Sequence, residues 1–112
     1  MTYRERQRLL DILAAIDAIR AHVARGTLDD GLVFDAVRIR LLEVGEAVKA
    51  LPEDLVRSEP SIPWRQIAGR RDQLAHRYFD TSHAIVAATV DHDLGDLYVA
   101  TQRILDAMPD DD

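Results

Sequence analysis

Hydrophobic residues recur along the first half of this chain at spacings of three and four positions, the period of a helix with one face on a core. Over residues 4–25 the pattern predicts an amphipathic helix that Gly26 ends. A second helix is predicted over about 31–51, and Pro52 stops it. Its apolar residues form a seam close to a heptad repeat, which lines either an intramolecular bundle or a dimer interface. They are Phe34, Val37, Leu41, Val44, Val48 and Leu51.

The second half predicts shorter helices. Residues 52–62 are read as a turn of helix inside a loop, and Pro63 suits the first turn of a third helix. The buried face of that helix is predicted to be Trp64, Ile67, Ala68, Leu74 and Ala75. Residues 80–82 offer N-cap side chains for the next helix, and Asp91 predicts a kink or a new start. The last apolar stripe is Leu94, Leu97, Tyr98, Thr101, Ile104 and Leu105.

These patterns predict an all-α fold, an up-and-down bundle of four to five helices. No segment alternates with the two-residue period of a strand for more than a few positions. With 112 residues the chain has room for one core, so a single helical domain is expected over 1–108. Residues 109–112, which end in three aspartates, are expected to be a frayed acidic tail.

The amino-acid composition excludes several classes of protein. The absence of cysteine excludes disulfides, thiolate metal ligands and cysteine nucleophiles, and it fits a cytoplasmic location. No apolar run is long enough for a membrane span, and no signal sequence is recognised. The net charge of −6 argues against a protein that coats nucleic acid. Residues 57–77 nevertheless hold five arginines against two acidic residues, so a local anion site stays open.

The unusual chemistry is concentrated in residues 63–80, which hold the single tryptophan and four arginines. An arginine such as Arg71 can bind a phosphate through paired N–H groups, and His76 can transfer protons near neutral pH. Tyr78 can position a substrate, stack on a base or be a target of modification. On a straight helix His76 lies about 140° round from Arg71. Either the helix ends or kinks near His76, or a second copy of the chain completes the site.

Other readings of the same residues are structural. From spacing alone, an arginine near a helix end followed by His and Tyr is more often a capping and packing arrangement. Gly45 and Gly69 are each predicted to allow close helix packing, and Glu43 and Glu46 are read as a solvated face. No histidine or carboxylate cluster has metal-ligand spacing, so no bound metal is expected.

A family resemblance rests on two blocks of sequence. The segment from Arg71 to Tyr78 reads Arg-x4-His-x-Tyr and resembles the motif of HEPN domains. Residues 44–49 (Val-Gly-Glu-Ala-Val-Lys), 62–71 (Ile-Pro-Trp-Arg-Gln-Ile-Ala-Gly-Arg-Arg) and 78–80 (Tyr-Phe-Asp) resemble the HepT-like branch, the DUF86 family. The resemblance extends over essentially the whole chain.

The resemblance implies a homodimeric HEPN toxin, a metal-independent endoribonuclease of a toxin–antitoxin pair. Arg71 and His76 would be its catalytic pair, in a cleft between two protomers. The antitoxin would be an MntA-like nucleotidyltransferase that uses ATP to attach AMP to Tyr78, while the toxin itself needs no cofactor. The added bulk and charge would then block the RNA cleft.

Four further residues are candidates for supporting roles. Many family members have Asn where this chain has Asp72, a carboxylate that could shift the pKa of His76 or weaken phosphate binding. Arg65, Arg70 and Arg77 are predicted contacts to the RNA backbone. Two other functions remain open. One is a non-catalytic module that docks a nucleotidyltransferase or binds nucleotide, and the other is a structural bundle whose motif only packs.

Overall fold

The computed structural model describes residues 3–75 and 79–109, and for residues 79–82 it describes the backbone alone. Every secondary-structure element in these ranges is a helix, which confirms the predicted all-α class. The elements are α1 (Tyr3–Arg25), α2 (Gly31–Lys49), α3 (Glu53–Arg57), α4 (Trp64–Ala75), α5 (Phe79–His92) and α6 (Leu94–Ala107). Six helices are found here instead of four or five, because the short turn α3 is a helix and the last region divides at Asp93.

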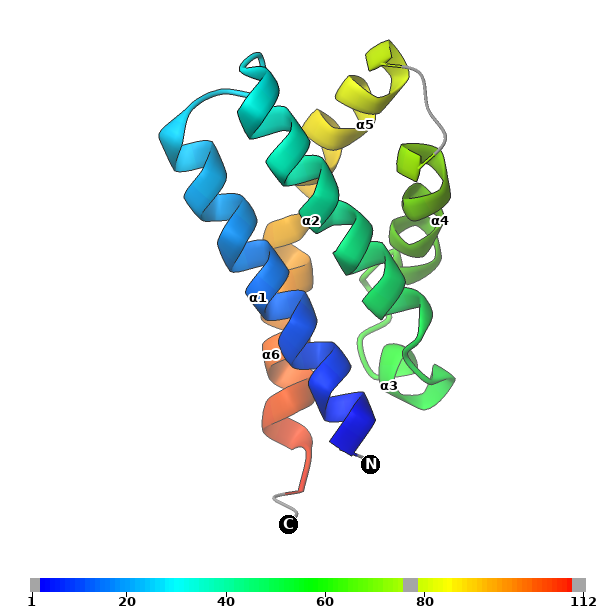
Figure 1. The fold of residues 1–112 in the computed structure, drawn as a ribbon. Helices are drawn as coiled ribbons and strands as arrows, with labels where there is room; N and C mark the ends of the chain where they lie inside the picture. Colours follow the sequence, from blue (N-terminus) through cyan, green and yellow to red (C-terminus); the bar gives the residue numbers. More distant parts are fainter. Residues whose placement is uncertain (1–2, 76–78, 110–112) are drawn as a thin grey trace.

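Helix α2 is the central element of the bundle, and it packs against α1, α4 and α5 (Figure 1). Helices α1 and α2 run antiparallel as a long pair, and α6 packs against α1. All six apolar residues of the predicted seam are buried within the single chain, five of them on α2 and Leu51 just after its end. The seam therefore lines the intramolecular core, the first of its two predicted roles.

The core follows the predicted helical stripes closely. Leu9, Ile12, Ile16 and Ile19 on α1 are fully buried, and so is Leu97 on α6. Each fully buried aliphatic side chain stabilises the fold by about 1.5–3 kcal/mol relative to an exposed one. The start of α2 is fixed by the Asp30 side chain, which accepts a hydrogen bond from the backbone N–H of Leu32 at 2.9 Å.

Three local predictions need correction. Ala75 is exposed, whereas its neighbour Leu74 in the same last turn of α4 is buried in the core. Residues 80–82 do not precede α5 as a cap but lie inside it, since the helix begins at Phe79. The new start predicted at Asp91 comes two residues later, at Asp93, whose side chain makes no capping bond but pairs with an arginine of α4. Pro63 directly precedes α4, and its carbonyl accepts the N–H of Ile67 at 3.0 Å.

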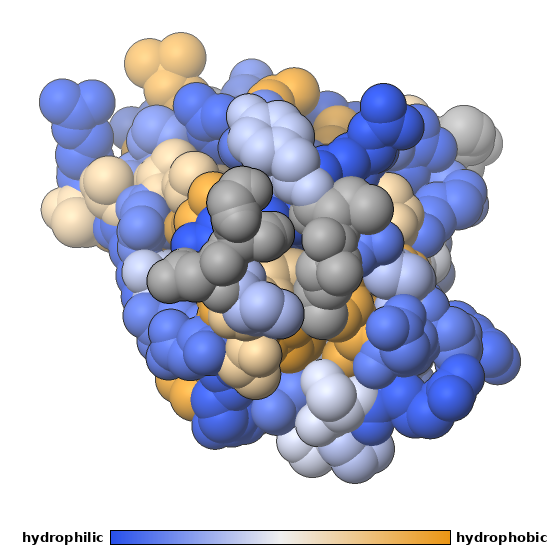
Figure 2. All heavy atoms as spheres, turned by 90° about the horizontal axis from the view of Figure 1, so that it is seen from below, coloured by the Kyte–Doolittle hydropathy of each residue, from blue (hydrophilic) through white to orange (hydrophobic). Residues whose placement is uncertain are grey.

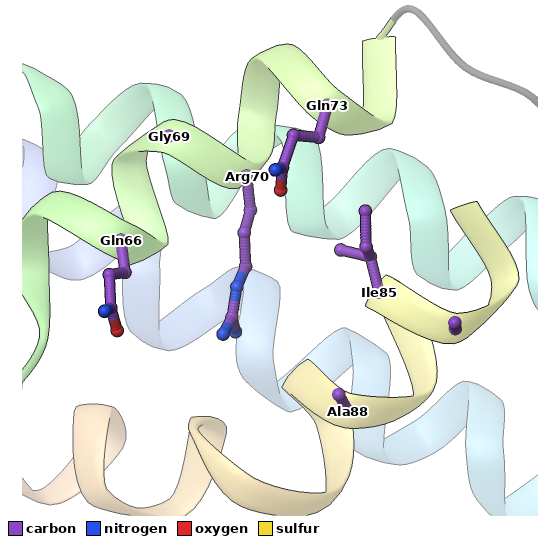
Figure 3. A pocket seen from close by; sticks show the side chains of 7 residues that line it. Gln66, Gly69, Arg70, Gln73, Ile85 and Ala88 are labelled. Carbon is purple, nitrogen blue, oxygen red and sulfur yellow. The ribbon is translucent and has the colours of Figure 1, made fainter. Parts of the chain in front are cut away.

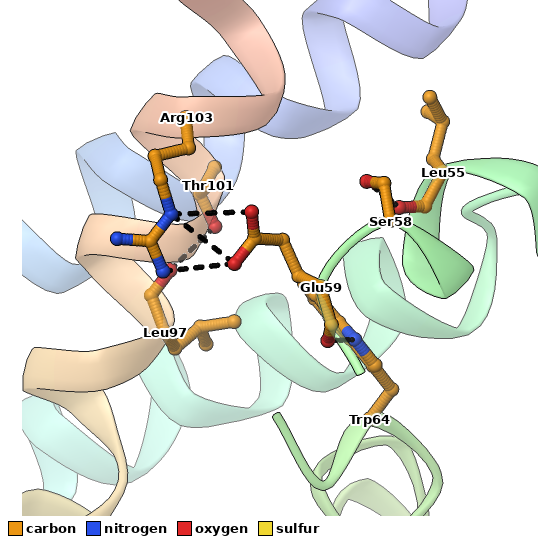
Figure 4. A network of polar contacts seen from close by, with 7 residues as sticks. All are labelled: Leu55, Ser58, Glu59, Trp64, Leu97, Thr101 and Arg103. Atoms are coloured by element: carbon orange, nitrogen blue, oxygen red, sulfur yellow. Dashed lines mark hydrogen bonds and ion pairs between the residues drawn. The ribbon is translucent and has the colours of Figure 1, made fainter. Parts of the chain in front are cut away.

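The loop before α4 is anchored at two points (Figure 4). The indole N–H of Trp64 donates to the backbone carbonyl of Glu59 at 2.9 Å. The carboxylate of Glu59 accepts from the guanidinium of Arg103 on α6, with the shortest contact at 2.8 Å. The hydrogen bonds from Arg103 lower the pKa of Glu59 below its usual value. This network fixes the N-terminal end of α4 against α6.

Hydrophilic residues cover most of the end of the bundle where α3 and the two chain termini lie, and apolar side chains gather toward its middle (Figures 1 and 2). Over the part of the chain that the structure describes, no helix combines the length and apolar character that crossing a membrane requires. The boundary predicted at residue 108 follows directly on the end of α6 at Ala107, but most of the predicted tail lies outside the described residues.

Candidate functional site

The motif begins at Arg71 in the last turns of α4 and continues beyond the described part of that helix. Helix α4 ends at Ala75, and α5 begins at Phe79. The structure describes α4 only up to Ala75, next to His76, so both predicted alternatives stay predictions. His76, Arg77 and Tyr78 themselves lie outside the described residues. Arg38 of α2 donates a hydrogen bond to the Leu74 carbonyl, which places a positive charge at the negative end of the α4 dipole.

Arg71 lies where α4 passes closest to α2. A Cβ atom built on Gly45 would be only 2.6 Å from the Cβ of Arg71, a distance that real side chains do not reach. Gly45 thus allows the close helix packing that was predicted for it. The next residue of α2, Glu46, forms an ion pair with Arg71, with 2.6 Å between Oε2 and Nη2. The fold therefore joins the two separate sequence blocks at one point.

Asp72 provides a second carboxylate for the same guanidinium. Its Oδ1 accepts a hydrogen bond from Nη1 of Arg71 at 3.0 Å. The hydrogen bond to Asp72 and the negative charge of Glu46 both raise the pKa of Arg71 above its usual value, so this side chain stays cationic. The three side chains together carry one excess negative charge. We call Arg71, Glu46 and Asp72 the Arg71 cluster.

Arg70 points to a different side of α4 from Arg71. Its Nη1 contacts the carboxylate of Asp93 and donates to the hydroxyl of Thr89 at 2.9 Å, while Thr89 in turn donates to the Ile85 carbonyl at 2.7 Å. Arg70 therefore connects α4 to the junction of α5 and α6. In this position its guanidinium holds three helices together, and its contact to RNA stays a prediction.

Arg65 is exposed on α4, as a phosphate-binding residue needs to be. It lines a groove of about 650 Å³ between α2, α3 and α4, together with Lys49 and Arg57. Three cationic side chains thus gather beside the helix that carries the motif, although an acid, Glu53, also lines the groove.

Sequence reasoning missed two residues of the site and misjudged one glycine. Glu46 was read as part of a solvated face, yet it pairs with Arg71; its place directly after Gly45 in the family block was the available signal. Arg38 gave no signal, because its contact to Leu74 joins residues 36 positions apart. Gly69 was predicted to allow close packing, but a Cβ there would meet nothing within 4 Å.

The Arg71 cluster is suited to binding an anion by exchange. Arg71 is always cationic, and both of its acceptors are more than half exposed, at 55% for Glu46 and 64% for Asp72. A phosphate oxygen can take the place of a carboxylate oxygen because both accept the same paired N–H groups. Among the described residues, no three His, Cys, Asp or Glu side chains come together as metal ligands.

Comparison with known proteins identifies the family of this chain. The model of the family described as "Ribonuclease HepT-like" matches residues 9–104. A Methanocaldococcus jannaschii protein named "Putative RNase MJ0125" is 33% identical over 101 residues, which cover 87% of each chain. A Thermococcus cleftensis protein named "Probable ribonuclease HepT" is 38% identical over 93 residues, 80% of this chain and 84% of its own. No solved structure gives a significant match. The chain therefore belongs to the HepT-like ribonuclease family.

Proposed function

We propose that this protein is a metal-independent endoribonuclease and the toxin of a toxin–antitoxin pair, acting in the cytoplasm. The observation that carries the proposal is the Arg71 cluster, in which a permanently charged arginine pairs with two exposed carboxylates. Arg71 lies in α4 four residues before Ala75, the last described residue ahead of His76. Membership of a ribonuclease family supports the same conclusion.

In the proposed reaction the 2′-hydroxyl of a ribose attacks the adjacent phosphorus, and the bond to the 5′-oxygen of the next nucleotide breaks. His76 takes the proton of the hydroxyl, and the leaving oxygen receives a proton from the imidazolium or from water. The products are a 2′,3′-cyclic phosphate and a 5′-hydroxyl. Arg71 binds the phosphate and stabilises the negative charge that develops on its oxygens.

The active unit is proposed to be a homodimer with the motif of each protomer at a shared cleft. Arg65 and Arg77 would contact the RNA backbone there. The antitoxin, an MntA-like nucleotidyltransferase, would silence the enzyme by transferring AMP from ATP to Tyr78. An adenylyl group on Tyr78 would bring a phosphate of its own, which would compete with the RNA phosphate for the guanidinium of Arg71.

A second candidate function is a module that binds a nucleotidyltransferase or a nucleotide without catalysis. The pairing of Arg71 with two carboxylates favours it, since a guanidinium held in this way also serves as a structural contact.

The two functions are separated by incubating purified protein with total RNA in EDTA, beside the His76→Ala variant. We expect the wild type alone to cleave, because the reaction needs the imidazole but no metal. If neither protein cleaves, the intact mass shows whether AMP is attached to the preparation. An unmodified, dimeric and inactive wild type would refute catalysis and support the binding module.

A further inference from the structure

The groove between α2, α3 and α4 carries positive charge that is available to a ligand. Lys49 ends α2, Arg57 ends α3 and Arg65 lies in the first turn of α4. The lining holds these three cations against one acid, Glu53, a net charge of +2 on a chain whose net charge is −6. All three cations are exposed, and among the described residues no ion pair or hydrogen bond of their side chains is found. The charge of the groove therefore selects an anion.

A second opening, on the other side of α4, differs in this respect. It is a cleft of about 540 Å³ between α4 and α5 (Figure 3). The single cation in its lining is Arg70, which is paired with Asp93, a carboxylate that is only 17% exposed. Displacing Asp93 would leave a poorly solvated charge without a partner, which is costly. Of the two openings along α4, the groove at Lys49 and Arg65 is thus the one that offers unpaired cations.

The groove continues from the Arg71 cluster along the same two helices. On α2, Lys49 lies three residues after Glu46, just under one turn, and both residues are exposed. On α4, Arg65 lies seven residues before Asp72, close to two full turns, so the two share one face of the helix. Their separation along the helix axis is roughly 10 Å. An extended anion bound at Arg71 can therefore continue into the groove without leaving this surface.

Apolar side chains form much of the remaining surface of the groove. Val56, Ile62 and the half-buried ring of Trp64 all line it. The indole N–H of Trp64 already donates to the carbonyl of Glu59, so the ring offers apolar surface to a ligand. Single-stranded nucleic acid suits such a groove, because it combines a charged phosphate at every nucleotide with bases that have apolar faces.

We propose that this groove binds the RNA backbone on one side of the phosphate at Arg71, and that Lys49, Arg57 and Arg65 contact its phosphates. This inference rests on the proposed function. A stacked strand rises about 3.4 Å per phosphate, so the roughly 10 Å from Arg65 to the Arg71 cluster holds two or three phosphates. Contacts to phosphates carry no sequence information. The groove therefore favours single-stranded RNA that extends beyond the cleaved bond, whatever its sequence.

Lys49 is the single lysine of the chain, which allows occupation of the groove to be measured directly. The full chain with His76→Ala is treated with an amine-acetylating reagent, with and without a twelve-nucleotide single-stranded RNA of mixed sequence. Mass spectrometry follows the acetylation of Lys49, and a lysine-containing peptide in the same mixture is the internal reference. We expect saturating RNA to slow the acetylation of Lys49 several-fold, because a phosphate covers the amine, and to leave the reference peptide unaffected.

Variants without the charge measure what each cation contributes. RNA binding is titrated by fluorescence anisotropy in the His76→Ala background at several salt concentrations. Lys49→Gln, Arg57→Gln and Arg65→Gln should each lower the slope of log K against log salt by about 0.7. If the electrostatic contribution vanishes at 1 M salt, this slope corresponds to about fivefold weaker binding at 0.1 M. Arg65→Lys keeps the charge and should keep the slope. The matched control is Arg25→Gln, an exposed arginine in the last turn of α1, at the other end of the bundle from α3 (Figure 1), which should change neither quantity.

The outcomes distinguish this inference from the proposed function. Acetylation of Lys49 that RNA does not slow, or groove variants that bind RNA as Arg25→Gln does, would overturn the groove even if the wild type cleaves RNA. Stronger protection of Lys49 by a poly-glutamate peptide than by RNA would assign the groove to an acidic protein segment and would also overturn the proposal. Protection by RNA and a lowered salt slope, in a protein whose wild type does not cleave, would support the groove and refute the ribonuclease.

Discussion

Arg71 and Arg103 each bind carboxylates from another part of the chain, but the exposure of their partners differs. Arg103 pairs with Glu59, whose side chain is 16% exposed. Arg71 pairs with Glu46 and Asp72, which are 55% and 64% exposed. The charges of Arg103 and Glu59 balance, whereas the Arg71 cluster has one carboxylate in excess. The same side-chain chemistry is therefore used in two different environments.

The difference indicates which pair is structural. A carboxylate that is largely removed from water depends on its arginine, and losing that partner leaves a charge with little solvation. Exposed carboxylates lose little when a phosphate displaces them, because water solvates them at once. By this criterion Arg70, paired with a nearly buried Asp93, resembles Arg103 more than it resembles its neighbour Arg71. Adjacent arginines on α4 thus lie in different environments.

Replacing each arginine by glutamine tests this comparison most directly. We expect Arg71→Gln to reduce RNA cleavage by about 10²-fold or more, the usual cost of losing a group that stabilises transition-state charge. Its melting temperature should stay close to that of the wild type. Arg103→Gln should do the opposite, with cleavage unchanged and a melting temperature lower by a few degrees. The comparison fails if Arg71→Gln cleaves normally and is the less stable of the two.

Two helical glycines provide the next test, which concerns how Arg71 is positioned. Gly45→Ala places a Cβ 2.6 Å from that of Arg71, so α4 must move. Such overpacking costs about 1–3 kcal/mol of the free energy of unfolding, and we expect cleavage to fall as Arg71 shifts. The matched control is Gly69→Ala, which meets nothing within 4 Å and should gain up to about 1 kcal/mol from helix propensity. Denaturant titration measures both; equal effects would refute the close approach of α2 and α4.

A smaller effect is expected from removing one competing carboxylate. In Glu46→Gln the guanidinium of Arg71 loses one of its two anionic partners. An incoming phosphate then has only the carboxylate of Asp72 to displace. We expect the affinity of the His76→Ala background for a single-stranded RNA oligonucleotide to rise about two- to fivefold, the range that an exposed ion pair accounts for. Glu59→Gln is the control and should leave affinity unchanged. A lower affinity in Glu46→Gln would show that Glu46 positions Arg71 for the substrate instead of competing with it.

The helices and most of the core were predictable from the sequence, because burial follows the three- and four-residue period directly. The seam on α2 and the stripe on α6 are examples, and both lie in the core or at its edge. The errors occur at helix ends. Residues 80–82 are good N-cap types, but α5 starts earlier, and Asp93 is drawn to Arg70 instead of capping α6. At Asp93 the local preference was outweighed by a tertiary contact.

The site was only partly predictable. The motif identified Arg71, and its pairing with Asp72 joins neighbouring residues. The pairing with Glu46 depends on how α2 and α4 cross, which no pattern within one helix reveals. Gly45 and Gly69 illustrate the same limit, since both are single glycines in helices and only the fold shows that one meets a side chain and the other meets none.

The smallest expected effect is the pH dependence of the stability that the ion pair between Arg103 and Glu59 contributes. Because hydrogen bonds from Arg103 lower the pKa of Glu59 below its ordinary 4.5, the unfolded chain binds this proton at a higher pH than the folded one. The stabilisation of the fold by ionised Glu59 is therefore complete at pH values above 4.5, the ordinary pKa. It is lost as the pH falls through the lower pKa of Glu59 in the folded chain. We expect the difference in melting temperature between the wild type and Glu59→Gln to be constant from about pH 7 to 5.5 and to shrink below about pH 4.5. In an Arg103→Gln background, the difference in melting temperature that Glu59→Gln causes should no longer depend on pH. A difference that stays constant down to pH 3 would mean that Glu59 is held by its packing and not by Arg103, and the contrast with the exchangeable carboxylates of Arg71 would lose its basis.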